Sequence, residues 1–364
     1  MRAQDLALQR DKYKHLSDEE WRWFLQQIEG KERTADKLPT FAAIEDCWYP
    51  VRVSCEQCSS ELTAKYKASL VSGERMADLT GGYGVDTYFL SEHFAQADYV
   101  EQNAELCQIA THNFADKSIS IHNTSAEEFL ESAGQYDLIY LDPARRDNYG
   151  GKVFRLEDCT PNVVELLPTL LAHLTIGGRI MLKLSPMLDI TQAVTALKAV
   201  RWDVHVVAVK NEVKEVLLLS GGEGKIRAID LAKKEQAFTF TREEESLSTF
   251  NSQLSTFTYL YEPNAAILKA GAYKLVAQRF GLQKLDVNTH LYASEKLVAE
   301  FPGRVWHVTE QQPDKQANVL TRNYPLTPEQ VKKKLHLRDG GTAFVIGCRV
   351  NGKPTLFFAE RVDC

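Results

Sequence analysis

The stretch MADLTGGYGVD, residues 76–86, joins an apolar lead-in, three glycines and the start of an amphipathic run. It predicts a strand, a tight turn and the first turn of a helix. Such a turn needs glycine where the backbone takes a positive φ or where a ligand comes close. The start of a helix offers unpaired N–H groups and the positive end of the helix dipole, so it suits an anionic ligand group. We therefore expect a binding site here, with a purely structural turn as the alternative.

The glycine spacing separates two kinds of site. A dinucleotide site has the pattern G-x-G-x-x-G, but Gly82 and Gly84 are followed by Val85-Asp86-Thr87, so the third glycine is missing. An acid, Asp78, lies four residues before Gly82. This arrangement resembles the first motif of class I S-adenosylmethionine-dependent methyltransferases, although Thr80 stands where many members have glycine. The resemblance implies that Asp78, Thr80, Gly82 and Gly84 hold the methionine end of S-adenosylmethionine.

Length and composition limit the class of protein. The chain has 364 residues, which suggests two or three domains. Its 44% hydrophobic and 25% charged residues are typical of an ordinary soluble protein. The net charge of −6 argues against bulk electrostatic binding to nucleic acid. Any contact with RNA would therefore need a local basic surface.

The sequence offers no signal for secretion or membrane insertion. The first ten residues, MRAQDLALQR, contain no apolar segment of the secretory type. No stretch approaches the roughly 20 apolar residues of a membrane helix. Seven cysteines spread over this length do not resemble a disulfide framework. We expect a cytoplasmic protein that has no membrane partner.

The first 70 residues predict a helical region. Residues 17–20 form a capping box, followed by Trp21 and further apolar residues at helical spacing, so Trp21 and Trp23 are expected to pack rather than to stack on bases. Leu38-Pro39 is expected to end the helical part. The three cysteines that follow lack a fourth partner at a suitable spacing for zinc, so no metal site is expected; they are Cys47, Cys55 and Cys58.

The segment 57–61 opens a helix that runs to about Leu70. One interpretation is an N-cap followed by an acid, which would be purely structural. The other is that this turn, just before the first strand, touches the methionine end of the cofactor. Both interpretations stay open at the level of sequence.

Two further strand ends predict contacts with the cofactor. Residues 98–101 read as a second strand ending in Glu101, which lies 23 residues after Asp78. In nucleotide-binding sheets an acid about 20 residues on accepts hydrogen bonds from ribose hydroxyls. The third strand, 119–122, is followed by Ser125-Ala126. By resemblance these two residues meet the adenine, with Ser125 at the usual Asp position.

The fourth strand, 136–141, is largely apolar, as a buried parallel strand should be, and it ends in Asp142-Pro143-Ala144-Arg145-Arg146. This resembles the D-P-P-aromatic motif of methyltransferases that act on exocyclic amines of bases. An aryl amine is a poor nucleophile, and an acceptor for its N–H groups restores nucleophilicity and aligns the nitrogen. The resemblance assigns Asp142, Pro143 and Arg145 to catalysis. Ala144 replaces the second proline and Arg145 the aromatic.

Basic residues near this edge are the predicted substrate contacts. The segment 148–161 is long and contains two glycines, so we expect a substrate lid. The fifth strand, 180–184, ends on the edge that also carries Gly82 and Asp142. The predicted contacts are Arg146, Lys152, Arg155 and Lys183. Residues 204–209 and 216–219 predict a closing hairpin, with a solvated charged connection between them.

The last 140 residues predict a smaller α+β region. A polar boundary is expected at 243–255, a helix at 265–280 ended by Gly281, and strands at 291–292, 305–308, 343–350 and 355–360. Asn351-Gly352 is a strong hairpin signal. The helix 328–335 carries Lys332 and Lys333, which we expect to contact an RNA backbone, a solvated lysine face being the alternative.

Five motifs in order extend the resemblance over nearly the whole chain. They are QCSSE-x-TA-x-YKA, DLTGG-x-GVD, DPARR, NEVKE and YEPNAAILKAG. Together they resemble bacterial class I methyltransferases with a ferredoxin-like segment and a C-terminal THUMP-like domain. The family implies an α/β, Rossmann-like methyltransferase sheet with an N-terminal helical segment and a small C-terminal α+β domain.

The expected domains are an N-terminal helical region at 1–70, the methyltransferase domain at 71–222, a linker and ferredoxin-like segment at 223–290, and a THUMP-like domain at 291–364. The expected activity is methylation of a base nitrogen in structured rRNA or tRNA, with S-adenosylmethionine as cofactor. A methyltransferase for a protein or small molecule and a non-catalytic RNA-binding protein are the alternatives.

Overall fold

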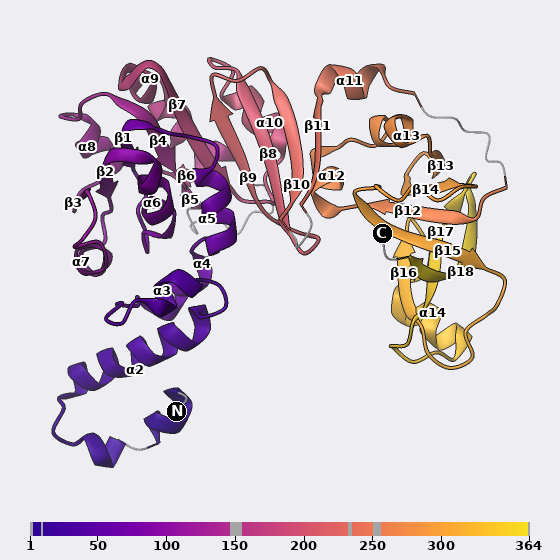
Figure 1. Ribbon diagram of the computed structural model, residues 1–364, viewed down its shortest axis with the longest axis horizontal. Helices are drawn as coiled ribbons and strands as arrows, with labels where there is room; N and C mark the ends of the chain where they lie inside the picture. Colours follow the sequence, from indigo (N-terminus) through magenta and orange to yellow (C-terminus); the bar gives the residue numbers. More distant parts are fainter. Residues whose placement is uncertain (1–2, 9, 146–154, 232–234, 250–255, 363–364) are drawn as a thin grey trace. The chain divides into compact units, whose positions relative to one another are not determined.

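The computed structural model describes residues 3–8, 10–145, 155–231, 235–249 and 256–362. The chain divides into two compact units (Figure 1). The first comprises Met1–Trp202 and Leu217–Glu223, and the second comprises Asp203–Val216 and Gly224–Cys364. Each unit is described by itself.

The first unit is built on a sheet with strand order β9-β7-β4-β1-β2-β3, in which β7, β4, β1, β2 and β3 run parallel. β1 pairs in parallel with both β2 and β4, β2 with β3, and β4 with β7. The carboxyl ends of these strands therefore meet at one edge, where ligands of such sheets bind. The strands are β1 (Gly73–Asp78), β2 (Phe94–Val100), β3 (Ile119–His122), β4 (Tyr136–Leu141), β7 (Leu174–Leu184) and β9 (Glu212–Ser220).

Helices and short elements connect these strands. They are α6 (Val85–Leu90), η2 (Ser91–His93), α7 (Ala104–Asn113), α8 (Ala126–Leu130), β5 (Ala144–Arg145), η3 (Leu156–Asp158), β6 (Cys159–Thr160), α9 (Val163–Ala172) and α10 (Ile190–Ala196). The strands at 119–122 and 136–141 are confirmed as predicted. β6, in the described part of the segment expected to be a lid, pairs antiparallel with β5, which precedes that segment.

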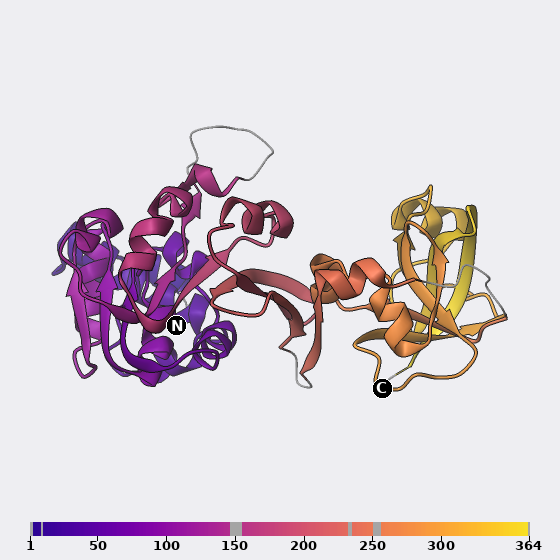
Figure 2. The ribbon, with the colours of Figure 1, turned by 90° about the horizontal axis from the view of Figure 1, so that it is seen from above.

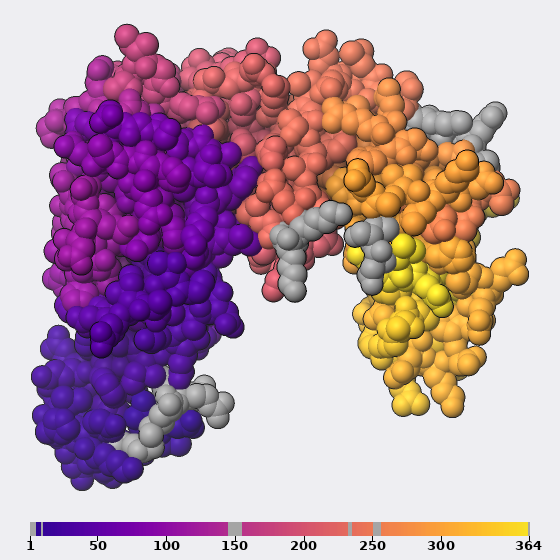
Figure 3. Space-filling model, viewed as in Figure 1, coloured from indigo at the N-terminus to yellow at the C-terminus, as the bar shows by residue number. Residues whose placement is uncertain are grey.

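The N-terminal region is helical, as predicted, and its capping box is present: Ser17 caps α2 (Asp18–Thr34). Trp21 is buried and stacks on Phe24, so its packing role is confirmed. The helical part does not end at Leu38-Pro39, because Pro39 occupies the first turn of another helix, where its fixed φ is favourable. The other helices are α1 (Ala3–Ala7), η1 (Arg10–Tyr13), α3 (Pro39–Ala43), α4 (Arg52–Gln57) and α5 (Glu61–Ala68). Figure 3 shows this region in indigo.

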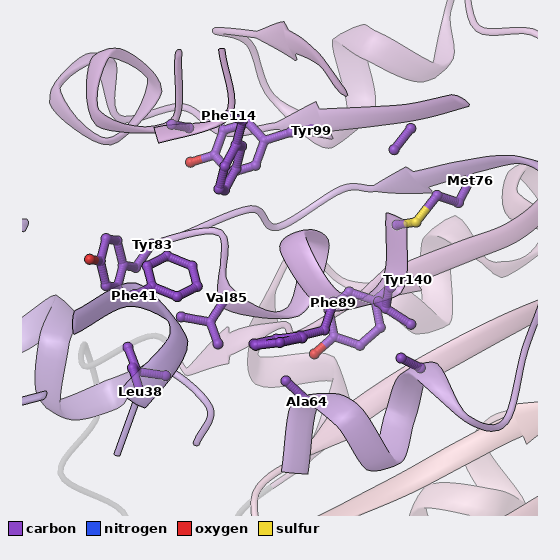
Figure 4. Close-up of a cluster of buried hydrophobic side chains, with 14 of the residues drawn as sticks. Leu38, Phe41, Ala64, Met76, Tyr83, Val85, Phe89, Tyr99, Phe114 and Tyr140 are labelled. Atoms are coloured by element: carbon purple, nitrogen blue, oxygen red, sulfur yellow. The ribbon is translucent and has the colours of Figure 1, made fainter. Parts of the chain in front are cut away.

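One buried cluster joins the N-terminal region to the glycine turn and the sheet. The Phe41 ring lies 5.4 Å from that of Tyr83 and 5.0 Å from that of Tyr88. Figure 4 shows Phe41 beside Tyr83, and Phe114 against Tyr99. α5 packs on α6 (Figure 1). The N-terminal residues therefore belong to the same core as the turn.

The second unit begins with the strand order β11-β10-β8-β9. These strands are β8 (Trp202–Val209), β10 (Lys225–Asp230) and β11 (Gln236–Thr241), with β9 shared between the units because the division lies inside it. The predicted hairpin is present, and three of the charged residues over 210–215 are exposed as expected, but the turn itself is shorter. Only Lys210 and Asn211 form the turn, with φ of 53° and 64°, and Glu215 is buried within β9.

The other sheet of this unit follows the order β13-β14-β12-β15-β18-β17-β16. Its strands are orange to yellow in Figure 2. Its strands are β12 (Tyr259–Pro263), β13 (Gln283–Asp286), β14 (Thr289–Ser294), β15 (Gly303–Thr309), β16 (Asn318–Arg322), β17 (Ala343–Val350) and β18 (Lys353–Val362). The four strands predicted in this region are confirmed. Asn351 and Gly352 form the predicted two-residue hairpin between β17 and β18.

One prediction for this unit was wrong. The helix expected at 265–280 is two helices, α12 (Ala265–Ala270) and α13 (Leu275–Phe280), because Gly271 ends the first in the left-handed conformation with φ 82°. The polar stretch expected as a boundary contains α11 (Arg242–Leu247). The Glu245 carboxylate in α11 accepts hydrogen bonds from three successive backbone N–H groups at residues 273–275. The last helix, α14 (Pro328–Leu335), is confirmed.

Among the described residues, no helix has the length and apolar character needed to cross a membrane.

Candidate active site

A cavity of about 400 Å³ opens at the carboxyl edge of the parallel sheet in the first unit. Its walls come from the glycine turn, the ends of β2 and β4, the segment before α8, α4, and the β5–β6 pair. The lining residues are Ser54, Gln57, Cys58, Leu79, Thr80, Gly82, Tyr83, Val100, Glu101, Gln102, Leu106, Thr124, Ala126, Asp142, Ala144, Thr160 and Pro161. The glycine turn, Glu101 and Asp142, which the sequence predicted at the ends of three strands, thus line one cavity.

The glycine turn has the conformation that the sequence predicts, since Gly82 and Gly84 have φ of 55° and 82°. A Cβ at Gly81 or Gly84 would meet the rings of Tyr99 or Phe114 at 2.2 and 2.4 Å. A Cβ at Gly82 would meet nothing closer than 3.8 Å. Gly81 and Gly84 therefore allow close packing, whereas Gly82 faces the open space of the cavity.

Asp78 lies beneath this turn and does not line the cavity. Its carboxylate accepts hydrogen bonds from Thr80 N at 3.0 Å and from the Thr87 hydroxyl at 2.6 Å. Burial raises the pKa of Asp78 to about 7, although the hydrogen bonds from Thr87 and Thr80 oppose this rise. The acid of the first motif therefore shapes the turn from below.

Glu101 follows β2 and lines the cavity. Its carboxylate accepts from Gly82 N at 2.9 Å and from Asn103 N at 2.8 Å. Tyr99 adds a hydrogen bond from its hydroxyl to Gly82 O at 2.6 Å. The second strand end is thus tied directly to the glycine turn, and the half-buried Glu101 carboxylate remains at the cavity wall.

Ser125 and Ala126 have different positions. Ser125 caps α8 in a capping box with Glu128, so its hydroxyl accepts from Glu128 N at 3.1 Å. Ala126 lines the cavity together with Thr124. The wall expected to meet adenine is therefore formed by the residues on either side of Ser125.

Asp142 lies where β4 ends, and its side chain is 38% exposed toward the cavity. Its backbone N–H donates to the Thr80 hydroxyl at 2.6 Å, and its carboxylate forms an ion pair with Lys183. Pro143 is half-buried beside it. Arg145 lies in β5, with its backbone opposite Cys159 of β6.

The predicted substrate contacts fall into three groups. Arg146 and Lys152 lie outside the described residues. Arg155 and Lys333 are exposed, as a contact with a large substrate requires. Lys183 is largely buried against Asp142, and Lys332 pairs with Asp339 at 2.8 Å. Lys332 and Lys333 belong to the second unit.

Comparison with known proteins identifies the family. A solved structure from Porphyromonas gingivalis, described provisionally as a methyltransferase, is 33% identical, with a TM-score of 0.86 over 95% of this chain and 92% of that chain. Two Mycobacterium tuberculosis proteins, described as uncharacterised S-adenosylmethionine-dependent methyltransferases, are 21% identical over 348 residues, or 90% of this chain and 92% of theirs. Family models match a ferredoxin-like domain at 259–302 and a THUMP domain-like region at 304–361.

The chain belongs to this family of S-adenosylmethionine-dependent methyltransferases. The fold class and the cofactor expected from the sequence, S-adenosylmethionine, are confirmed with it. The cofactor supplies a methyl group that its sulfonium centre already activates.

The cavity of the methyltransferase fits this cofactor. Gly82 leaves free the space that a side chain would fill, and the half-buried Glu101 carboxylate can accept hydrogen bonds from ribose hydroxyls. Thr124 and Ala126 form a wall on the side where the third strand ends. These residues would hold the cofactor next to Asp142.

The methyltransferase cavity also has residues that sequence reasoning missed or left open. α4 contributes Ser54 and Gln57, and the turn after it contributes Cys58, while Ser60 caps α5. The N-cap interpretation of the segment 57–61 is therefore confirmed, and contact of this turn with the cofactor stays a prediction that its place at the cavity wall allows. The missed element is α4, because its six residues carry no strong helical pattern.

A second missed feature is a buried ion pair behind the glycine turn. Lys67 is fully buried and its ammonium lies 3.2 Å from the Asp86 carboxylate. Asp86 also accepts from the hydroxyls of Ser59 and Tyr140, both at 2.7 Å. Burial opposes ionisation of Asp86, but Lys67 and Lys183 lower its pKa overall. Lys67 is the lysine of the motif QCSSE-x-TA-x-YKA, and Asp86 is the last residue of DLTGG-x-GVD. Their places in these two motifs were the only sequence signal for the pair.

The cysteines near the cavity are free thiols. Burial raises the pKa of Cys55 to about 12 and also raises that of Cys58. Within the described ranges, no group of three or more His, Cys, Asp or Glu side chains is placed to hold a metal ion.

Proposed function

We propose that this methyltransferase methylates a base nitrogen of structured RNA. The observation that carries the proposal is the hydrogen bond from Asp142 N to the Thr80 hydroxyl. It joins the residue of the D-P-A motif to the turn of the cofactor motif, and both line the same cavity. An acceptor held by Asp142 would therefore lie beside the methyl donor.

Each predicted residue has a proposed role. Glu101 would accept from the ribose, and the residues around Ser125 would meet the adenine. Asp142 and Pro143 would orient the acceptor, and Arg145 with Arg146 would contact the base or a phosphate. Thr80, Gly82 and Gly84 would hold the methionine end of the cofactor. Asp78 would support them by holding the turn in shape.

The chemistry asked of the chain is modest. An exocyclic amine on a base has its lone pair delocalised into the ring, so it needs acceptors for its N–H groups. A carboxylate oxygen of Asp142 supplies such an acceptor at the cavity wall. Catalysis then rests mainly on proximity and alignment, which are worth several orders of magnitude in rate.

Two features support RNA as the substrate. The region 304–361 matches a THUMP domain-like model, and Arg155 and Lys333 are exposed cations suited to phosphates. We also propose the domain boundaries near residues 70, 222 and 290. They agree with a catalytic domain followed by smaller substrate-binding regions.

The test is transfer of labelled methyl from S-adenosylmethionine into bulk RNA and bulk protein from a strain that lacks this gene. Wild type is compared with Asp142→Ala and with a matched control, Asp116→Ala, whose side chain is exposed after α7. We expect label in RNA with wild type and with Asp116→Ala, and a loss of about 100-fold or more with Asp142→Ala.

Other outcomes would lead elsewhere. Label in protein alone would reject RNA and favour a protein methyltransferase. RNA binding with a steep salt dependence, no labelling and no cofactor affinity in calorimetry would favour a non-catalytic RNA-binding protein.

A further inference from the structure

Lys183 stands directly beside Asp142 because of the register of the sheet. β4 and β7 pair in parallel with Leu141 opposite Leu182, so the next residues, Asp142 and Lys183, emerge together at the carboxyl edge. The Lys183 side chain is only 13% exposed, and its ammonium forms an ion pair with Oδ2 of Asp142. A buried ammonium requires such a partner because its desolvation is costly.

Lys183 forms its ion pair with Asp142 and also lies close enough to Asp86 to help lower the pKa of that carboxyl. Asp86, the nearby second carboxylate, has its own cation in Lys67, at 3.2 Å. The hydroxyls of Ser59 and Tyr140 also donate to Asp86. Asp86 therefore has a cation and two hydroxyl donors of its own, while Asp142 has Lys183 as its ion-pair partner.

Asp142 is held at two separate points. Its backbone N–H is fixed by the Thr80 hydroxyl at 2.6 Å, from the glycine turn. Its carboxylate is fixed through Oδ2 by Lys183, from β7. Among the described residues, no donor is recorded at Oδ1, and the side chain lines the cavity. One oxygen therefore orients the carboxylate while the other is available to a ligand.

The surroundings of Lys183 differ from those of a lysine that binds substrate phosphates. A lysine that contacts RNA phosphates must present its ammonium to solvent, whereas that of Lys183 is enclosed and paired. Lys183, which the sequence analysis predicted as a substrate contact, therefore does not have the geometry of one.

We propose that Lys183 is a positioning residue, which holds the Asp142 carboxylate with one oxygen directed at the methyl acceptor. The inference rests on the proposed function, in which Asp142 accepts N–H hydrogen bonds from that acceptor. Lys183 holds Oδ2 of Asp142 through the ion pair, and the register of β4 and β7 places the two residues side by side. It deepens the proposal by adding an orienting residue that does not itself touch substrate.

The test combines kinetics with a double-mutant cycle. Lys183→Met, Asp142→Asn and the double variant are compared for kcat, KM, affinity for S-adenosylmethionine by calorimetry, and melting temperature. Lys183→Arg is the conservative variant, and Lys198→Met, which changes an exposed lysine after α10, is the matched control. The acceptor is whichever RNA or protein fraction wild type labels.

We expect Lys183→Met to lower kcat by about 100-fold with little change in cofactor affinity. In the Asp142→Asn background the same change should have no further effect on kcat, because Lys183 acts through Asp142. The melting temperatures should likewise be non-additive, which reports the ion pair without any turnover. Lys183→Arg should recover much of kcat, and Lys198→Met should resemble wild type.

Three results would overturn the inference. An unchanged kcat in Lys183→Met would do so, as would kcat losses that multiply in the double variant. Changes in melting temperature that add up in the double variant would show that Lys183 and Asp142 do not interact. In each of these cases wild type that labels RNA leaves the proposed function standing. Wild type that labels neither RNA nor protein would instead reject the proposed function and this inference with it.

Discussion

The hydroxyl of Thr80 accepts a hydrogen bond from the backbone N–H of Asp142 at 2.6 Å. Thr80 belongs to the turn after β1, and Asp142 follows β4, which pairs with β1 in parallel. A glycine at residue 80, as in many relatives of the first motif, would provide no such acceptor. The threonine that departs from the motif thus connects the two halves of the cavity.

The first prediction concerns this connection. Thr80→Val keeps the shape of the side chain but leaves the Asp142 N–H without an acceptor, which should cost about 1–3 kcal/mol of stability. The displaced Asp142 should also lower kcat by about 10-fold or more. Urea unfolding and methyl-transfer kinetics measure both effects. Thr80→Ser, which keeps the hydroxyl, should stay close to wild type, and equal losses in both variants would contradict the role of the hydroxyl.

The second prediction concerns cofactor affinity. Glu101→Ala removes the carboxylate that accepts from Gly82 N and that would accept from the ribose. Hydrogen bonds to a charged group contribute about 1.5–3 kcal/mol, so the Kd for S-adenosylmethionine should rise by about 10- to 100-fold. Calorimetry measures this directly, with Asp116→Ala as the control. An unchanged Kd would remove Glu101 from the cofactor site.

The third prediction separates two glycines of one turn. Gly82→Ala should cost about 1–2 kcal/mol because residue 82 has φ 55°, and its new methyl would project into the cavity and weaken cofactor binding. Gly84→Ala has the same strain and adds a contact of 2.4 Å with the Phe114 ring, so its loss of stability should be larger.

Melting temperature and calorimetric Kd distinguish these two variants. Gly82→Ala should remain largely folded while its affinity falls. A Gly84→Ala protein as stable as wild type would show that the Phe114 ring can move aside.

The fourth prediction concerns pH. Burial raises the pKa of Asp78 to about 7 in the folded protein, against about 3.9 in an unfolded chain. Between these values the folded state binds the extra proton, so this group's contribution to stability falls as pH rises from about 4 to about 7. The free energy of unfolding should fall by at most about 1.4 kcal/mol per pH unit from this group, and the fall should end above pH 7.

Asp78→Asn should remove this part of the pH dependence, because its side chain does not titrate. Urea unfolding at several pH values from 4.5 to 8 compares wild type, Asp78→Asn and the exposed control Asp116→Asn. A steeper or unchanged slope in Asp78→Asn would assign the dependence to other groups.

Local sequence patterns correctly predicted those elements in which backbone preference and burial favour the same structure. The apolar run of β4, the glycine turn after β1, and the hairpin at Asn351-Gly352 all follow from backbone preference and burial. The same patterns failed where a distant contact decides. The helix expected over 265–280 is divided at Gly271, where the Glu245 carboxylate from α11 binds the N–H groups of residues 273–275. Glu215, expected in a solvated turn, is buried in β9.

The sequence by itself determined the order of strands and turns, the family, and the set of residues at the strand ends, because these depend on local spacing and chemistry. Only the tertiary structure decided how those residues are used. Asp78 lies under the turn, Ser125 caps a helix, and Lys183 is buried against Asp142. Spacing along the chain places a residue at an edge of the sheet, but the register between β4 and β7 determines which side chains meet there.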